Sequence, residues 1–142
     1  MENIVTKYPM KTGNNWGTGI LLFNEEGKVL TGLRTDTHNW CTPGGKVEVG
    51  ETVEEGMRRE LKEETSLSDI SLSYLGYNVG AFHNQKVWIS FLFTGKVKNG
   101  TPKPQLSELS ELKWVTLEEL QKLELFPPTK ILVDEYIKSK ER

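Results

Sequence analysis

The sequence predicts one mixed α/β domain covering residues 1–142. Its length is that of an ordinary single domain, and a hydrophobic fraction of 36 % is enough for one core. Segments rich in β-branched and aromatic residues alternate with turns, while helical signals follow a Pro-Gly-Gly loop and return at the end of the chain. No repeat, low-complexity segment or linker divides it.

The predicted strands begin with a hairpin, in which residues 18–34 form two strands around a turn at 24–27. Residues 39–48 read as a short apolar piece that runs into the Pro-Gly-Gly loop. Further strands are expected at 70–82, 86–97 and 111–115, with residues 99–108 as a loop. The segment 86–97 is apolar enough to be a central strand.

Three helices are expected, over residues 52–65, 116–123 and 129–140. The first two open with capping boxes, in which a threonine and a glutamate three residues later bond to each other's backbone: Thr52 with Glu55, and Thr116 with Glu119. The third comes after a Pro-Pro pair.

Composition excludes several classes of protein. The net charge is −2 and the pI about 5.8, and no basic stripe is visible, so a duplex nucleic acid is not an expected partner. One cysteine, Cys41, rules out an internal disulfide. No apolar run has the length of a signal peptide or a membrane span. A reducing cytoplasm is the expected compartment.

The first helix places acidic residues on its inner side. At about 100° per residue, Val53, Met57 and Leu61 form the inward stripe. Glu64 falls within that arc and Glu60 lies beside it. A solvated face is the ordinary explanation for a Glu-rich helix. It does not suit these two residues, because a half-buried carboxylate is unfavourable without a partner.

Three glutamates, Glu60, Glu63 and Glu64, have i, i+3, i+4 spacing and are expected to converge and repel each other. Two of them lie in the last turn, where the helix dipole favours cations. A divalent cation relieves both effects, and the all-oxygen set indicates Mg²⁺ or Mn²⁺ rather than zinc. Gly44 and Gly45 permit positive φ and a close backbone approach, although a plain tight turn is an open alternative.

The stretch from Gly45 to Leu67 resembles the Nudix hydrolase box, G-x5-E-x7-R-E-U-x-E-E-x-G-U, in which U is a bulky aliphatic residue. The matching positions are Gly45, Glu51, Arg59, Glu60, Leu61, Glu63, Glu64 and Leu67. Ser66 replaces the last glycine, which would be the left-handed residue that ends the helix. A serine there is disfavoured by about 1 kcal/mol. The resemblance extends over roughly residues 16–138.

This resemblance implies an α/β/α sandwich with a mixed β-sheet, and hydrolysis of a nucleoside diphosphate linked to another group. It implies an ion pair between Arg59 and Glu51 that braces the loop against the helix. It also implies a set of site residues, namely the carbonyl of Gly45 and the carboxylates of Glu60, Glu63 and Glu64 as metal ligands, and Glu63, Glu64 and Arg59 as the catalytic set.

Phosphoanhydride hydrolysis requires neutralised phosphate oxygens and an activated water. A glutamate of the 63/64 pair is favoured as the base, with Glu108 or Glu111 as the alternative. Arg34 is a candidate for binding a substrate phosphate, and a surface salt bridge is equally open. Aromatic residues could stack on a nucleobase, or form part of the core. The candidates for stacking are Tyr77, Phe82, Trp88 and Phe126, together with His83.

The leading hypothesis is a MutT-like nucleoside triphosphate pyrophosphohydrolase that releases a nucleoside monophosphate and pyrophosphate. ADP-ribose, nucleotide sugars, dinucleoside polyphosphates and capped RNA ends stay open as substrates. A non-catalytic nucleotide-sensing Nudix module is the alternative of a different class, and the complete set of box glutamates argues against it. The expected partner is a nucleotide substrate, no membrane partner is expected, and a homodimer is left open.

Overall fold

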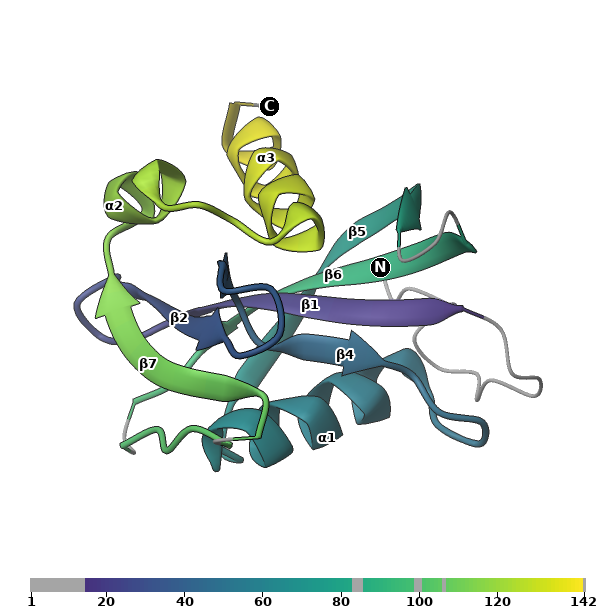
Figure 1. Cartoon of the computed structure of the whole chain (residues 1–142), viewed down its shortest axis with the longest axis horizontal. Helices are drawn as coiled ribbons and strands as arrows, with labels where there is room; N and C mark the ends of the chain where they lie inside the picture. The colour runs from purple at the N-terminus through teal and green to yellow at the C-terminus, as the bar shows by residue number, and fades with distance from the viewer. Residues whose placement is uncertain (1–14, 83–85, 99–100, 106, 142) are drawn as a thin grey trace.

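A seven-stranded sheet carries the fold (Figure 1). The computed structural model describes residues 15–82, 86–98, 101–105 and 107–141. Its elements are β1 (Trp16–Phe23), β2 (Val29–Arg34), β3 (Trp40–Cys41), β4 (Gly44–Lys46), α1 (Val53–Thr65), β5 (Ser71–Phe82), β6 (Lys86–Lys96), β7 (Leu109–Val115), α2 (Leu117–Lys122) and α3 (Pro127–Glu141).

The sheet is mixed, as predicted. Its main order is β3-β2-β1-β6-β5, with β4 paired to β1 and β7 paired to β2. The β1–β6 pair is parallel, with Trp16 opposite Ile89 and Phe23 opposite Lys96, and the other pairs are antiparallel. The prediction of a central strand at 86–97 is confirmed, because β6 lies between β1 and β5.

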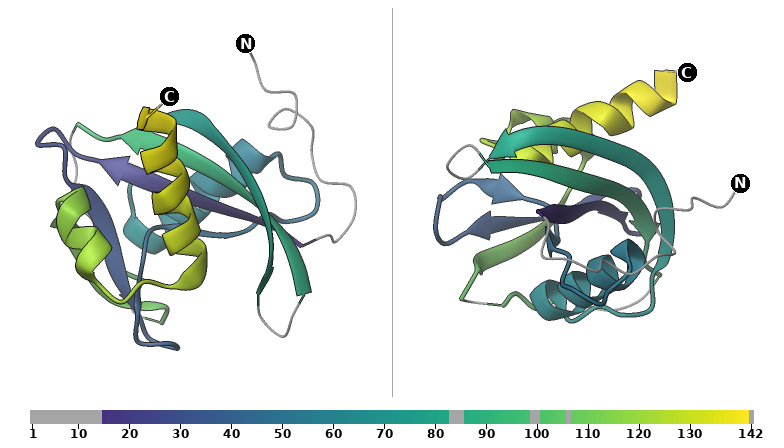
Figure 2. Two further views of the ribbon diagram at one scale, coloured as in Figure 1. Left: turned by 90° about the horizontal axis from the view of Figure 1, so that it is seen from above. Right: turned by 90° about the vertical axis from the view of Figure 1, so that its right-hand side faces the viewer.

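The helices cover both faces of the sheet, with α1 on one side and α2 and α3 on the other (Figures 1 and 2). Successive side chains of β1 point to opposite faces of the sheet. Ile20 and Leu22 belong to the cluster that contains the α1 residues, whereas Leu21 packs in the cluster that contains Leu120 of α2 and Leu132 of α3. The expected α/β/α sandwich is therefore confirmed.

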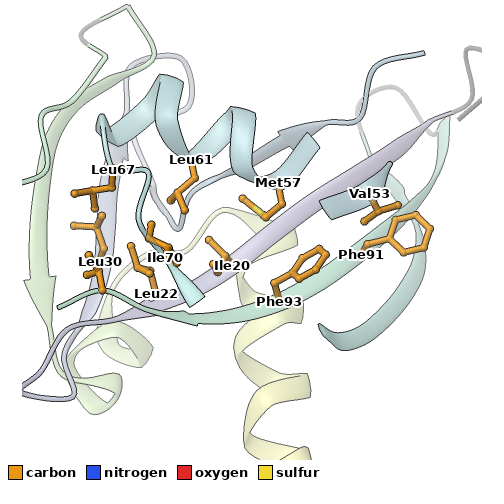
Figure 3. Close-up of a cluster of buried hydrophobic side chains, with 11 residues drawn as sticks. Ile20, Leu22, Leu30, Val53, Met57, Leu61, Leu67, Ile70, Phe91 and Phe93 are labelled. Carbon is orange, nitrogen blue, oxygen red and sulfur yellow. The ribbon is translucent and has the colours of Figure 1, made fainter. Parts of the chain in front are cut away.

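The inward stripe predicted for α1 is also confirmed. Val53 and Met57 are fully buried and Leu61 is 1 % exposed, and Figure 3 shows them facing the sheet residues of the same cluster, among them Phe91 and Phe93. Full burial of each such side chain contributes roughly 1.5 to 3 kcal/mol. This packing fixes the rotation of α1 about its axis, and hence the position of its glutamates.

Both ends of α1 form as the sequence predicted. Thr52 and Glu55 form a complete capping box at the start. Ser66 adopts the left-handed conformation, with φ 66°, and its N–H donates to the carbonyl of Lys62 at 2.9 Å. Backbone N–H groups of Lys103 and Gln105 donate to the last carbonyls of the helix. The loop before β7 therefore lies against the end of α1.

The Pro-Gly-Gly loop is where the prediction fails. Gly44 and Gly45 belong to β4, opposite Gly19 and Thr18 of β1, and neither has positive φ. A Cβ atom on Gly44 would overlap the Thr18 carbonyl, and one on Gly45 would overlap the carboxyl of Glu60. Close approach, which the sequence did indicate, is thus the reason for both glycines.

The remaining elements need only small corrections. The capping box of α2 is confirmed. Helix α3 begins at Pro127, earlier than expected, because proline fits the first turn, where its missing N–H is not needed. Strand β7 begins at Leu109 rather than at residue 111. Residues 99–100 and 106 of the predicted loop lie outside the described residues. In the described part of the chain, no helix is long and apolar enough to cross a membrane.

Candidate active site

A pocket of about 430 Å³ opens between the sheet, the C-terminal half of α1 and the start of α3. Two groups of side chains give it its chemical character. One is acidic and consists of Glu60, Glu64 and Glu108. The other is cationic and aromatic and consists of Arg34, Trp88 and Phe126.

The acidic group is built around a pair of carboxyls from α1. Glu64 is 4 % exposed, and its Oε1 accepts a hydrogen bond from the Gly44 N–H at 3.3 Å. Burial raises the pKa of Glu64 well above its usual range, and the charge of Glu60 raises it further. Burial also raises the pKa of Glu60, against the opposing effect of Arg59. A buried carboxyl in contact with a half-buried one favours uptake of a cation or a proton.

Arg59 is the brace that the family resemblance implied. Its Nε donates to Glu51 Oε2 at 2.7 Å and its Nη2 to Glu51 Oε1 at 3.1 Å, so the expected ion pair is confirmed. Nη2 also donates to the Lys46 carbonyl at 2.8 Å, and Nη1 donates to Glu60 at 3.0 Å. One guanidinium thus ties β4, the loop before α1 and a pocket carboxylate together. Arg59 itself does not line the pocket.

Glu63 is placed apart from the other two glutamates. Its side chain is 51 % exposed, it accepts a hydrogen bond from Arg59 Nη1 at 3.2 Å, and it does not line the pocket. Among the described residues, no three His, Cys, Asp or Glu side chains lie close enough together to hold a metal ion. Glu63 nevertheless lies near Glu60, because both accept from Arg59 Nη1, so a metal site formed by all three glutamates stays a prediction.

The donors that do face the pocket fit a hard divalent cation. Glu60 and Glu64 supply carboxylate oxygens, and Gly45 lies against Glu60 with its carbonyl accepting from Thr18 Oγ1 at 3.2 Å. A carbonyl oxygen has a second lone pair, so this bond leaves it able to coordinate an ion. Oxygen ligands of this kind suit Mg²⁺ or Mn²⁺.

Arg34 of the cationic and aromatic group is held in one orientation. Its Nε and Nη2 donate to the two oxygens of Asp36 at 2.9 and 2.7 Å. Its guanidinium lies 3.9 Å from the centroid of the Phe126 ring. The hydrogen bonds from Arg34 hold the pKa of Asp36 well below its usual range. Arg34 therefore both lines the pocket and forms the salt bridge that the sequence left open.

Comparison with known proteins gives the family. The NUDIX domain model matches residues 13–136. An RNA pyrophosphohydrolase of Bartonella clarridgeiae is 34 % identical over 131 residues, covering 72 % of this chain and 76 % of the relative. A putative 8-oxo-dGTP diphosphatase of Bacillus subtilis is 32 % identical over 101 residues, with coverage of 70 % and 65 %. The MutT protein of Methanosarcina mazei has a structure that matches with a TM-score of 0.76 at 25 % identity, covering 93 % of this chain and all of that one.

The chain belongs to the Nudix family. It is a hydrolase, and Nudix hydrolases generally use divalent metal ions. The fold agrees with the NUDIX domain of Shewanella oneidensis NrtR as well, which was solved with ADP ribose and has a TM-score of 0.77 at 18 % identity.

Some of the other residues predicted for the site of this Nudix hydrolase line the pocket, and others do not. Trp88, Phe126 and Glu108 line the pocket. Tyr77 does not line it and is 64 % exposed, and Glu111 is exposed on β7. The side chain of Phe82 and the whole of His83 lie outside the described residues.

Several pocket residues of the Nudix site gave no signal in the sequence. Asp36 orients Arg34, and the Thr42 N–H, just after β3, donates to Oγ1 of Thr129 in α3 at 3.3 Å. Cys41 also lines the pocket, and burial raises the pKa of its thiol to about 12, so it is protonated at neutral pH. Threonine and aspartate are common in loops and strands, so their presence in the sequence does not mark a site. Asp36, Thr42 and Thr129 are recognised as pocket residues only because the fold brings distant segments together.

Proposed function

We propose that this Nudix hydrolase cleaves a phosphoanhydride of a nucleoside triphosphate with Mg²⁺ bound at Glu60, Glu64 and the Gly45 carbonyl. The products are a nucleoside monophosphate and pyrophosphate. One observation carries the proposal: a single pocket holds the half-buried Glu60 and the buried Glu64 together with the Arg34–Phe126 stack. The two carboxylates can bind the divalent ion that accompanies a polyphosphate. The Arg34–Phe126 stack can pack against a planar nucleobase.

The orientation of Arg34 decides how it meets the substrate. Asp36 occupies the Nε–Nη2 edge of the guanidinium, one of the two edges with which arginine can bind a phosphate in the bidentate manner. Arg34 and Phe126 therefore offer flat surfaces to the nucleobase, with Trp88 as a further aromatic wall. Binding of a substrate phosphate through the Nη1–Nη2 edge is the alternative role of Arg34.

The chemical step uses the carboxylates that face the pocket. Mg²⁺ held by Glu60, Glu64 and the Gly45 carbonyl would neutralise phosphate oxygens and make a water molecule easier to deprotonate. The Glu64 carboxylate accepts a proton from the attacking water, whose oxygen forms a bond to phosphorus while the anhydride P–O bond breaks. Pyrophosphate leaves with the electron pair of that bond. Glu108 also faces the pocket and is the alternative base.

The role of the other members of the predicted catalytic set is inferred from their contacts. Arg59 acts as a positioning residue, because it touches Glu60 and Glu51 but not the pocket. Glu63 accepts from Arg59 through Oε2, which leaves its Oε1 as a further candidate ligand for the ion. The functional unit is the domain of residues 1–142, and Cys41 as a lone buried thiol suits a reducing cytoplasm.

A second candidate is hydrolysis of the 5′-triphosphate end of an RNA. It is favoured by the relatives named RNA pyrophosphohydrolase, of which the Bartonella clarridgeiae protein is 34 % identical. The chemistry and the residues are the same, since pyrophosphate again leaves and a monophosphate stays on the nucleoside. The two candidates differ only in whether the first nucleoside carries an RNA chain on its 3′ oxygen.

The test is a substrate panel in which release of phosphate or pyrophosphate is measured. The panel contains nucleoside triphosphates, 8-oxo-dGTP, ADP-ribose, a dinucleoside polyphosphate and a triphosphorylated RNA, each with Mg²⁺ and with EDTA. The proposal expects the fastest Mg²⁺-dependent turnover on a free triphosphate. Faster turnover of the RNA would select the second candidate, and turnover of ADP-ribose alone would contradict both.

A further inference from the structure

Exposed apolar side chains gather near the C-terminal end of β5 and the N-terminal end of β6. Tyr77 and Val79 of β5 are 64 % and 56 % exposed, and Val87 of β6 is 61 % exposed. The register places Val79 opposite Ile89 and Ala81 opposite Val87. Residues directly opposite in an antiparallel pair point to the same face, so Tyr77, Val79 and Val87 form one surface, named here the β5–β6 patch.

This patch belongs to the edge of the sheet. Among the described strands, β5 pairs only with β6, and both views in Figure 2 show it outermost beside β6. The backbone N–H and C=O groups on its outer side have no strand partner within the described residues. Such an edge is a template for pairing with another chain.

Strand β5 has almost none of the sequence features that prevent an edge strand from pairing with another chain. Its sequence, SLSYLGYNVGAF, contains no Lys, Arg, Asp, Glu or Pro. A bulge shifts the register between Tyr74 and Gly76, and residues 76–82 beyond it continue without further irregularity. Charges, prolines and bulges are the features that normally prevent edge pairing. Within the described part of the chain, residues 76–82 therefore form a neutral, partly apolar edge with no strand beside it.

We infer that the chain forms a twofold symmetric dimer in which residues 76–82 of β5 pair antiparallel with the same residues of a second copy. The neutrality of the strand is the argument for a second copy. Twofold pairing sets a segment against itself, so a charged residue near the axis would face its own like charge. The described strand has no such residue, and Val79 would face Val79 of the second copy while Tyr77 would face Ala81.

The dimer leaves the pocket on the other face of the sheet. Ser90 and Trp88 line the pocket, and they pair with Asn78 and Gly80 of β5. Side chains alternate along a strand, so the pocket and the β5–β6 patch use opposite faces. The inference stands independently of which substrate the pocket binds.

The primary test is sedimentation equilibrium of the full chain. A dimer is expected within the micromolar range, and Val79→Lys is expected to give a monomer with an unchanged circular dichroism spectrum. Val49→Lys is the matched control, because Val49 is 60 % exposed but lies in the loop before α1, and this variant should stay dimeric. A monomer at about 100 µM, far above a micromolar dissociation constant, overturns the inference.

A crosslink locates the contact even where a lysine unfolds the strand. The only native cysteine, Cys41, is 4 % exposed, so Val79→Cys adds the sole accessible thiol. Val79 lies at the middle of residues 76–82, and Val79→Cys is expected to form an intermolecular disulfide under mild oxidation. Val49→Cys should not. Equal crosslinking of the two variants, or a dimer that Val79→Lys leaves intact, overturns the inference.

Discussion

Asp36 accepts two hydrogen bonds from Arg34, and the same guanidinium lies over the ring of Phe126. Asp36 is itself oriented by the Thr37 N–H, which donates to its Oδ1 at 2.7 Å. The carboxylate is exposed, yet it determines which surface of Arg34 the pocket presents. An exposed side chain at the rim of the pocket thereby shapes the proposed binding site for the base.

Asp36→Asn is expected to raise KM roughly three- to tenfold while changing kcat little, because orientation of Arg34 affects binding more than chemistry. Asparagine has one oxygen acceptor, so it cannot hold both guanidinium nitrogens. Steady-state kinetics on the best substrate of the panel measures the effect. Glu26→Gln is the control, since it removes the exposed pair with Lys28 and leaves the pocket unchanged. A fall in kcat at constant KM would contradict the positioning role.

Removal of divalent metal is expected to abolish hydrolysis. The carboxylate and carbonyl oxygens proposed as ligands include no nitrogen or sulfur donor that favours zinc. Activity should return with Mg²⁺ or Mn²⁺ and poorly with Zn²⁺. Undiminished turnover in excess EDTA would count decisively against the proposed metal site.

Glu64→Gln is expected to lower turnover by roughly 10²-fold or more, the scale for loss of a general base or an electrostatic stabiliser. The metal-free fold should be as stable or more stable, because the substitution removes charge from a buried carboxyl beside Glu60. Mg²⁺ should raise the melting temperature of the unmodified protein more than that of the variant. Glu54→Gln, an exposed acid of the same helix, is the control. Retention of most activity would remove Glu64 from the mechanism.

Ser66→Gly is expected to stabilise the fold by a few tenths to about 1 kcal/mol, because Ser66 has φ 66° and glycine adopts that conformation without steric strain. Ser68→Gly is the matched control two residues away, where φ is not positive. There, glycine only adds entropy to the unfolded chain, and a small loss is expected. Urea unfolding of both variants gives the comparison, and destabilisation by Ser66→Gly would show that its hydroxyl matters.

Glu51→Gln is expected to lower the free energy of unfolding at neutral pH by roughly 1 to 3 kcal/mol, the range for hydrogen bonds to a charged group. Hydrogen bonds from Arg59 lower the pKa of Glu51 in the fold. Its contribution is therefore complete above the ordinary glutamate range near pH 4.3 and is lost as pH falls through the lowered pKa of the folded state.

The difference between this variant and the unmodified protein should shrink on acidification. Urea unfolding at several pH values measures it, with Glu118→Gln, which removes an exposed pair with Lys122, as the control. A difference that is constant with pH would mean that the shape of the side chain, rather than its charge, supports Arg59.

The sequence alone determined the features of this protein that depend on neighbours along the chain. The rotation of α1 was predicted from the spacing of Val53, Met57 and Leu61, and it placed Glu64 inside. Its capping box at Thr52 was predicted from local backbone chemistry, whereas the motif marked position 66 as left-handed and Ser66 adopts that conformation despite its side chain. The motif indicated the family and the pairing of Arg59 with Glu51. Periodicity and capping act within a few residues, so they can be read directly.

The tertiary structure decided what depends on segments far apart. Gly44 and Gly45 joined the sheet because β1 passes beside them, and that contact explains why both are glycine. Glu63 turned to Arg59 instead of the pocket, since that guanidinium is fixed by Glu51 and Lys46 from outside the helix. Arg34 contacts Phe126 because the segment before α3 bonds to Trp40 of β3, which pairs with β2, and no local pattern encodes that contact.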